Sequence, residues 1–125
     1  MSVRLLLVGL LVGLAGSLGA NANDRLSMKV SPAVSFAPAN LVIRATVAAD
    51  DDNRLIEITA ESDDFYRSSE IQLEGKKAPR TTLVYFRSLP GGAYSVRATL
   101  KDASGHERAL VQSNITVIGD DPMDR

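Results

Sequence analysis

The feature that most constrains this chain is the spacing of its apolar residues, which recur at every second position over most of residues 26–118. Such alternation is typical of strands with one buried and one solvated face, whereas a helix places apolar residues three or four positions apart. Asp, Asn, Pro and Gly interrupt the alternation at short intervals, as turn residues do between strands. The sequence therefore predicts an all-β domain of short antiparallel strands.

Seven strands follow from this pattern. They are expected at residues 28–36 with a break at Pro32, and at residues 41–47, 55–61, 71–73, 82–89, 93–100 and 109–117. The prolines of the first strand suit a sheet edge, because proline cannot donate to a central ladder. The short strand at Ile71 and Leu73 is also expected at an edge. The strand number matches two packed sheets, with an eight-stranded barrel as the alternative.

The six-residue segment Leu89-Pro90-Gly91-Gly92-Ala93-Tyr94 resembles the tyrosine corner of fibronectin type III and other immunoglobulin-like domains. The resemblance implies an antiparallel immunoglobulin-like β-sandwich in which the Tyr94 hydroxyl binds backbone at the corner, with Leu89 buried and Gly91 in the turn. The chain has no Trp and no Cys, so the likeness is to the superfamily. It implies inward side chains at Val84 and Phe86 and outward ones at Tyr85 and Arg87. Among the aromatic residues, the predicted core contains Phe36, Phe86 and Tyr94.

Residues 1–22 differ in composition from the rest of the chain. After Arg4 there is no charge until Asp24, and a Leu- and Val-rich run ends in small residues at Ala20-Asn21-Ala22. This order predicts a signal peptide cleaved after Ala22 and hence a periplasmic or secreted domain at residues 23–119, with a short acidic tail at 120–125. No membrane span is expected after cleavage. The alternative is an uncleaved anchor, because residues 5–22 are uncharged and approach the length of a spanning helix.

Composition argues against several function classes. Because the chain has no Cys, thiol nucleophiles, thiolate metal sites and disulfides are excluded. A net charge of −1 argues against general nucleic-acid binding, which needs a clustered basic surface. The single histidine, His106, falls in a predicted turn, and no serine-nucleophile motif is present. We therefore expect a protein that is not an enzyme and needs no cofactor.

Acidic clusters are one kind of candidate site. Three adjacent aspartates, Asp50, Asp51 and Asp52, fall in a predicted turn and could supply some of the oxygen ligands that calcium takes. Their spacing fits no EF-hand loop, and aspartate is also favoured in turns for its own backbone hydrogen bonds. Weak calcium binding is thus a hypothesis beside a purely structural turn.

The segment Asp63-Asp64-Phe65-Tyr66-Arg67 is the other candidate, because it combines aromatic and charged residues on an expected loop. Exposed aromatic side chains beside polar groups are typical of binding sites, although Phe65 or Tyr66 could instead close the end of the sandwich. We expect this loop as far as Ser69, with the edge at Ile71 and Leu73, to bind another envelope or extracellular protein. Binding of a polysaccharide through Phe65 and Tyr66 is the second hypothesis, and a purely structural role is the third.

Overall fold

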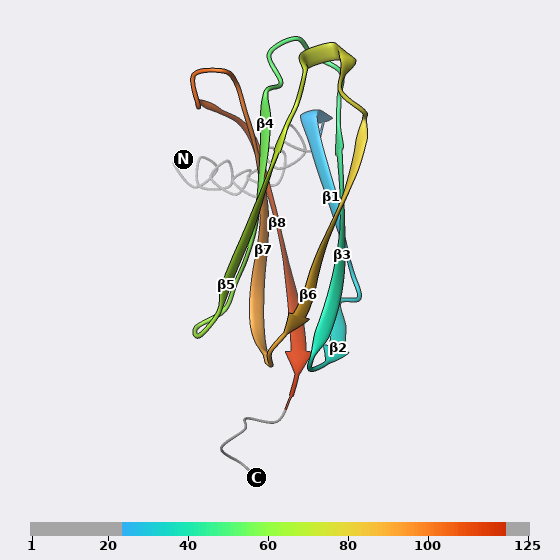
Figure 1. The fold of residues 1–125 in the computed structure, drawn as a ribbon, viewed down its shortest axis with the longest axis vertical. Coiled ribbons are helices and arrows are strands. Elements are labelled where there is room, and N and C mark those ends of the chain that lie inside the picture. Colours follow the sequence, from blue (N-terminus) through green and yellow to red (C-terminus); the bar gives the residue numbers. More distant parts are fainter. Residues whose placement is uncertain (1–23, 120–125) are drawn as a thin grey trace, which may run out of the picture.

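The computed structural model describes residues 24–119 and shows two β-sheets packed face to face (Figure 1). The predicted signal peptide and the acidic tail lie outside the described residues. Within residues 24–119, no helix is long and apolar enough to cross a membrane.

The three-stranded sheet has the order β1-β3-β6, and the five-stranded sheet has the order β2-β8-β7-β4-β5. The strands of the first sheet are β1 (Leu26–Ser31), β3 (Ala39–Val47) and β6 (Thr81–Leu89). Those of the second are β2 (Val34–Phe36), β4 (Leu55–Glu61), β5 (Tyr66–Gln72), β7 (Gly92–Lys101) and β8 (Glu107–Ile118). A 3-10 turn, η2 (Gly75–Lys77), connects β5 to β6.

The predicted all-β, two-sheet architecture is confirmed, with two corrections. The chain has eight strands between residues 24 and 119, because the first predicted strand divides at Pro32 into β1 and β2, which belong to different sheets. In addition, β2 pairs with β8 in parallel, so the sandwich is not wholly antiparallel. A proline at the division suits this arrangement, since both pieces lie at sheet edges.

The core lies between the sheets and is made of the alternate side chains that the sequence pattern predicts. Leu41, Ile43 and Ala45 of β3 are at most 1% exposed, and they face equally buried residues of β4 and β7. Those facing residues are Ile56, Ile58, Ala60, Val96, Ala98 and Leu100. Burial of this continuous apolar layer is the main stabilising term of such a domain.

One aromatic residue predicted to be in the core is not there. Phe36 is 75% exposed, because its parallel partner in β8 is Ile118, an outward-facing residue. The neighbouring pair, Ser35 and Val117, takes the inward side instead. The break at Pro32 separates β2 from β1, so the inward and outward positions of β1 do not continue into β2. The sequence alone therefore does not show which residues of β2 face the core.

A β-bulge in β6 explains how Phe86 and Leu89 both point inward although three positions separate them. Leu41 pairs with Phe86, whereas Ala39 pairs with Leu89, so β6 has one extra residue here. Ser88 takes a φ of 59° at the bulge, and its backbone N–H donates to the Asn40 side chain at 3.0 Å. The orientations that the resemblance implies for β6 are confirmed: the inward residues are buried, and Tyr85 and Arg87 are exposed.

The segment after Asp64 is a strand rather than a loop. Tyr66 and Arg67 begin β5, which is longer than the sequence predicted and forms an edge of the five-stranded sheet. The predicted edge position of this segment is confirmed. The side chains expected to be exposed there are not: Ile71 is half-buried, and Leu73, just beyond the strand, is 5% exposed.

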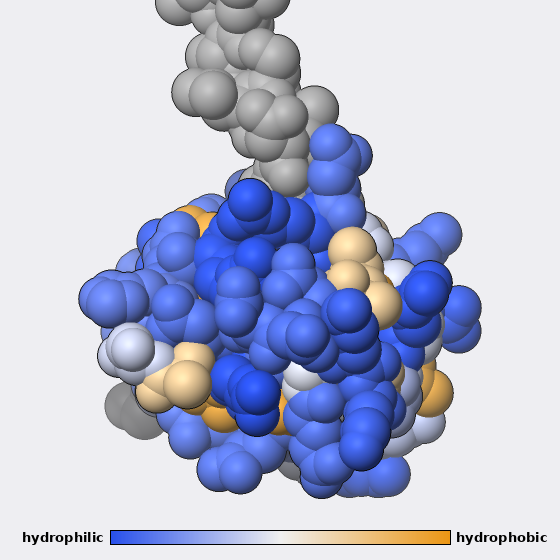
Figure 2. Space-filling view, turned by 90° about the horizontal axis from the view of Figure 1, so that it is seen from above, coloured by the Kyte–Doolittle hydropathy of each residue, from blue (hydrophilic) through white to orange (hydrophobic). Residues whose placement is uncertain are grey.

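The upper end of the sandwich carries the β3–β4 turn, η2 and the β7–β8 turn (Figure 1). Seen from above, this end is almost entirely hydrophilic (Figure 2). The exposed apolar side chains described below therefore do not gather at this end.

Candidate functional site

The lower end of the sandwich is organised by Tyr94, which is 2% exposed. Its hydroxyl donates a 2.7 Å hydrogen bond to the backbone carbonyl of Pro90, the contact implied by the resemblance to a tyrosine corner. Burial raises the pKa of Tyr94, because the phenolate form loses hydration there. Leu89 is fully buried beside this turn, and Gly91 lies so close to Gly119 that a Cβ on Gly91 would be 3.1 Å from the Gly119 nitrogen.

Two of the five predicted loop residues serve this packing. The half-buried Phe65 ring meets Tyr94 edge-on, with 6.3 Å between ring centroids. The Arg67 guanidinium lies 5.1 Å from the Phe65 centroid and donates a 2.9 Å hydrogen bond to the backbone carbonyl of Arg87 in β6. These contacts join the edges of the two sheets. The other three, Asp63, Asp64 and Tyr66, remain exposed.

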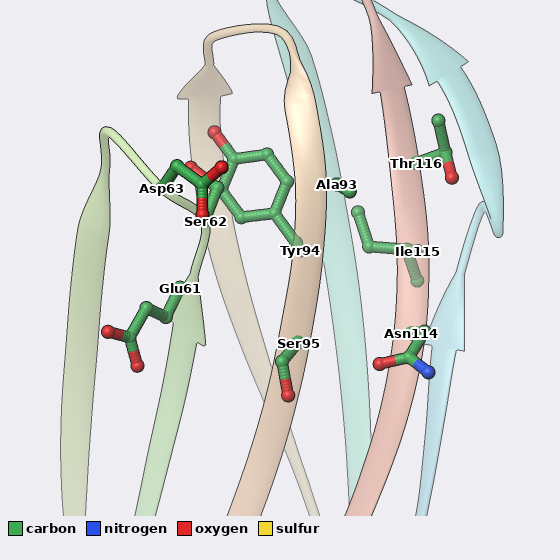
Figure 3. A pocket seen from close by; sticks show the side chains of 9 residues that line it. All are labelled: Glu61, Ser62, Asp63, Ala93, Tyr94, Ser95, Asn114, Ile115 and Thr116. Carbon is green, nitrogen blue, oxygen red and sulfur yellow. The ribbon is translucent and has the colours of Figure 1, made fainter.

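A shallow hollow of about 530 Å³ lies on the outer face of the five-stranded sheet at this end (Figure 3). Its lining comes from β4, the β4–β5 turn, β7 and β8, and consists of Glu61, Ser62, Asp63, Ala93, Tyr94, Ser95, Asn114, Ile115 and Thr116. Asp63 and Ser62 lie beside the Tyr94 ring (Figure 3). The side chains that reach solvent are mostly carboxylates, hydroxyls and one amide.

Exposed apolar side chains flank this hollow on both sides. On the β8 side, Val34, Phe36 and Ile118 are 59%, 75% and 46% exposed, and their strand register places all three on the outer face. On the β4 side, Tyr66 is 57% exposed and pairs with Glu61 of the hollow. We call the hollow with these four flanking residues the groove face. It spans the full width of the five-stranded sheet.

Most of the groove face was missed by the sequence prediction. Of the residues predicted to bind, only Asp63 and Tyr66 belong to it. Ser95, Asn114 and Thr116 occupy ordinary outward positions of strands, and nothing in their spacing marks them. The one available signal was Phe36, a large apolar residue on a short segment between two prolines.

The turn with Asp50, Asp51 and Asp52 lies at the opposite, upper end and is built around Asn53, which is 1% exposed. The Asn53 amide donates to the Ala48 carbonyl at 2.8 Å and accepts from Arg108 at 3.1 Å. Arg108 also lies 3.3 Å from an Asp50 carboxylate oxygen. The contact between Asn53 and Arg108 could not be predicted, because 55 positions separate the two residues.

Several carboxylate oxygens of the acidic turn are engaged by other residues of the protein. The other Asp50 oxygen accepts the backbone N–H of Asp52 at 2.8 Å, and Lys76 lies 3.8 Å from Asp51. Within residues 24–119, no three His, Asp or Glu side chains come close enough together to hold a metal ion. The Asp63-Asp64 pair is at the other end of the sandwich and cannot complete a site with this turn.

His106 lies in the β7–β8 turn with its side chain 79% exposed. Its Nδ1 is 3.6 Å from Asp102, whose carboxylate accepts the backbone N–H groups of Ser104 and His106 at 2.9 Å. These hydrogen bonds, that of His106 first, lower the pKa of Asp102. The pair therefore stabilises a turn in solvent.

No protein-family model matches this chain, and no curated protein is similar to it in sequence. Solved structures do resemble it. A superoxide reductase (neelaredoxin) from Ignicoccus hospitalis has a TM-score of 0.58 at 12% identity, covering 82% of this chain and 86% of that one. The PKD domain of an M14-like peptidase from a Thermoplasmatales archaeon has a TM-score of 0.53 at 18% identity, covering 75% of this chain and 93% of that domain.

A third resemblance is to a family 76 glycoside hydrolase from a bovine Bacteroides thetaiotaomicron strain. The TM-score is 0.53 at 13% identity over 74% of this chain, which matches only 20% of that enzyme. Identities this low show the fold alone. The sheet order, the Tyr94 corner and the likeness to a PKD domain together show an immunoglobulin-like β-sandwich fold.

Proposed function

We propose that this chain is an exported, non-catalytic interaction or adhesion module that binds another protein of the bacterial envelope or the extracellular space through the groove face. The observation that carries the proposal is the exposure of Val34, Phe36 and Ile118 side by side on one face. An apolar cluster left in water on a small domain usually marks a contact surface. The predicted signal peptide supports export to the periplasm or beyond.

The composition of the groove face supports a protein partner. Protein interfaces combine an apolar or aromatic centre with a polar rim, and Tyr, Phe and other aromatic residues are enriched at their energetic centres. Here Phe36 and Tyr66 flank a hollow that carries carboxylate, hydroxyl and amide groups, and both aromatic residues are held on paired strands rather than on free loops. A rigid surface loses little conformational entropy when it binds.

The shape of the hollow supports a role without catalysis. Sites for small substrates are usually deep and mostly apolar, with a few convergent polar groups. This hollow is shallow and lined by both polar and apolar atoms, and the Tyr94 hydroxyl beside it already donates to Pro90. A purely structural role is the remaining hypothesis; it would leave the exposure of Phe36 without a purpose.

Carbohydrate binding is a second candidate, favoured by the polar lining of the hollow. Carboxylates at Glu61 and Asp63 and the amide of Asn114 can each bond sugar hydroxyls, and Tyr66 offers a ring for stacking. Phe65, which the sequence analysis also assigned to sugar binding, is engaged with Tyr94 and Arg67. We also infer a superfamily-level likeness to fibronectin type III and other immunoglobulin-like domains, which the Tyr94 corner supports.

The test is affinity purification of the full chain, produced with its own leader and a C-terminal tag, after crosslinking in the native host. The variants Phe36→Ser and Tyr66→Ala are compared with His106→Ala, which alters an exposed ring at the opposite end. We expect one partner to be recovered with the natural chain and His106→Ala and lost with both groove-face variants. Recovery that is equal for all four proteins would contradict the proposal.

Two further measurements separate the alternatives. Amino-terminal sequencing of the purified chain is expected to begin at Asn23, and a start at Met1 or Ser2 in the membrane fraction would identify an uncleaved anchor instead. Titration with neutral polysaccharides distinguishes the two ligand classes. Saturable heat that Tyr66→Ala abolishes, without any protein partner, would favour carbohydrate binding.

A further inference from the structure

The three-stranded sheet has an unusual distribution of charge. Its strands β1, β3 and β6 contain Lys29, Arg44 and Arg87 but no Asp or Glu, although acidic residues slightly outnumber basic ones in the whole chain. In the five-stranded sheet, four acidic residues accompany four basic ones. All three cations of the three-stranded sheet are exposed on its outer face. This face is therefore locally positive on a protein that is not basic.

The register brings two of these cations directly together. Lys29 of β1 pairs with Arg44 of β3, and like charges placed opposite each other destabilise a sheet. No acidic side chain of the described residues forms an ion pair with either of them. Between them lies a depression of about 270 Å³ lined by Lys29, Ser31, Val42 and Arg44. A pair of like charges that destabilises the sheet and has no acidic partner is characteristic of a binding site.

Beside this depression are two more exposed side chains that suit a flat ligand. Tyr85 pairs with Val42 and is 53% exposed, and the Arg87 guanidinium lies 5.5 Å from its ring centroid. Leu83, which pairs with Arg44, is 44% exposed. Cations, hydroxyls and one aromatic ring thus line a single face, without a deep apolar pocket.

We propose that this face binds an acidic polysaccharide, with a carboxylate of the sugar chain between Lys29 and Arg44 and a neighbouring sugar ring against Tyr85. Arg binds a carboxylate through two parallel N–H groups, which suits a planar uronate group. Sugar hydroxyls would meet Ser31, which also lines the depression. The proposal is independent of the groove face, which lies on the other sheet.

Other polyanions fit this face less well. An acidic peptide is held in an apolar groove or by pairing along a sheet edge. Val42 is the one apolar residue that lines the depression, and the depression lies on the outer face of β1 and β3 rather than along the edge of β1. Anionic membranes are usually bound by clusters of about four to eight cations, and DNA by about six to ten phosphate contacts, whereas three cations are present here. Leu83 and Tyr85 lie within strand β6 and not on a loop that could insert into a membrane.

The test measures the affinity of the full chain for polygalacturonate, with fully methyl-esterified polygalacturonate as the matched uncharged polymer. We expect binding to the acid form only, and a steep loss of affinity when NaCl is raised from about 0.05 to about 0.5 M. The double variant Lys29→Gln with Arg44→Gln is expected to bind at least about tenfold more weakly, the effect of losing a charge-assisted hydrogen bond. Arg97→Gln, which removes an exposed cation from the other sheet, is the control and should bind as the natural chain does.

Several results would overturn this assignment. They are equal binding of the acid and ester forms, equal binding by the double variant and Arg97→Gln, and stronger binding to polyglutamate or phosphatidylglycerol vesicles than to polygalacturonate. The double variant removes a repulsive pair, so its melting temperature should equal or exceed that of the natural chain, and weaker binding will not reflect unfolding. If Tyr66→Ala abolished polygalacturonate binding and the double variant did not, the sugar would be bound by the groove face.

Discussion

The hydroxyl of Tyr94 donates a 2.7 Å hydrogen bond to the backbone carbonyl of Pro90, four residues earlier in the chain. The bond fixes the β6–β7 turn against β7, and Phe65 packs edge-on against the same ring. This contact therefore holds the end of the sandwich on which the groove face lies.

Tyr94→Phe should destabilise the domain, because it leaves the Pro90 carbonyl without its buried partner. We expect a loss of about 0.5 to 1.5 kcal/mol in the free energy of unfolding, the net contribution of one hydrogen bond, because Pro90 itself is exposed. Tyr85→Phe is the matched control, because Tyr85 is 53% exposed and should change stability by less than about 0.5 kcal/mol. Urea denaturation measures both, and equal values for the two variants would contradict a structural role for the corner.

The same residue predicts how stability changes in alkali. Burial holds the pKa of Tyr94 above its ordinary value of 10.0, so the unfolded chain loses this proton at a lower pH than the folded chain does. The contribution of Tyr94 is thus fully present below about pH 10 and is lost as pH rises further. Denaturant titrations at increasing pH should show this loss in the natural chain and a smaller one in Tyr94→Phe. Parallel curves would exclude this explanation.

Asn53→Ala should be among the most destabilising polar substitutions. It removes the donor to Ala48 and leaves Arg108 without one of its acceptors in a half-buried position. We expect a loss of about 2 to 4 kcal/mol. Asp52→Ala, at an exposed neighbour whose side chain makes no such bonds, should stay within about 0.5 kcal/mol of the natural chain. A comparable loss of stability in Asp52→Ala would mean that any substitution in this turn destabilises the domain, and that the hydrogen bonds of Asn53 are not the cause.

Gly75 and Gly105 form a natural comparison, because both have positive φ values, of 58° and 85°. Alanine is strained at either position, which costs about 1 kcal/mol. At Gly75, however, a Cβ would also lie 2.9 Å from the Asp51 carbonyl oxygen, whereas Gly105 has nothing within 4 Å. Gly75→Ala should therefore lower the thermal midpoint clearly more than Gly105→Ala. Equal shifts of the thermal midpoint would show that η2 can move away from Asp51 with little loss of stability.

Calcium at millimolar concentration should leave the thermal midpoint unchanged. Asp50 is bound by Arg108 and by backbone, and Asp51 lies near Lys76, so the cluster at residues 50–52 lacks free oxygens directed at one point. A ligand that binds the folded state must raise its stability by mass action. An increase with calcium that a chelator reverses would restore the calcium hypothesis for Asp50, Asp51 and Asp52.

The sequence predicted the central strands well and the edges poorly. In β3, β4 and β7 the apolar positions alternate without interruption, so one buried face follows directly from the pattern. At Phe36 the predicted burial was wrong, because a three-residue strand between prolines can turn either of its faces to the core. Its parallel partner, which decides the orientation, lies about 80 positions away in the chain. The function of Arg67 was missed for a similar reason: its partner, the Arg87 carbonyl, belongs to the other sheet.

The candidate site was predictable only in part. Tyr66 was recognised as an exposed aromatic residue beside acidic ones, and the structure leaves it exposed. The polar residues that line the hollow were not recognised from the sequence. Serine, threonine and asparagine occur at outward strand positions both in binding surfaces and in ordinary solvated sheets. Only the register of β4, β7 and β8 brings Glu61, Ser95 and Asn114 into one row.

The central claim is that the groove face contacts a partner protein, and crosslinking in living cells tests it most directly. A photoreactive amino acid replaces Phe36 or Tyr66 on the groove face, and His106 at the opposite end serves as the control position. We expect one crosslinked protein of the same identity from positions 36 and 66 and none from position 106. No product from either groove-face position, or the same product from all three positions, would contradict it.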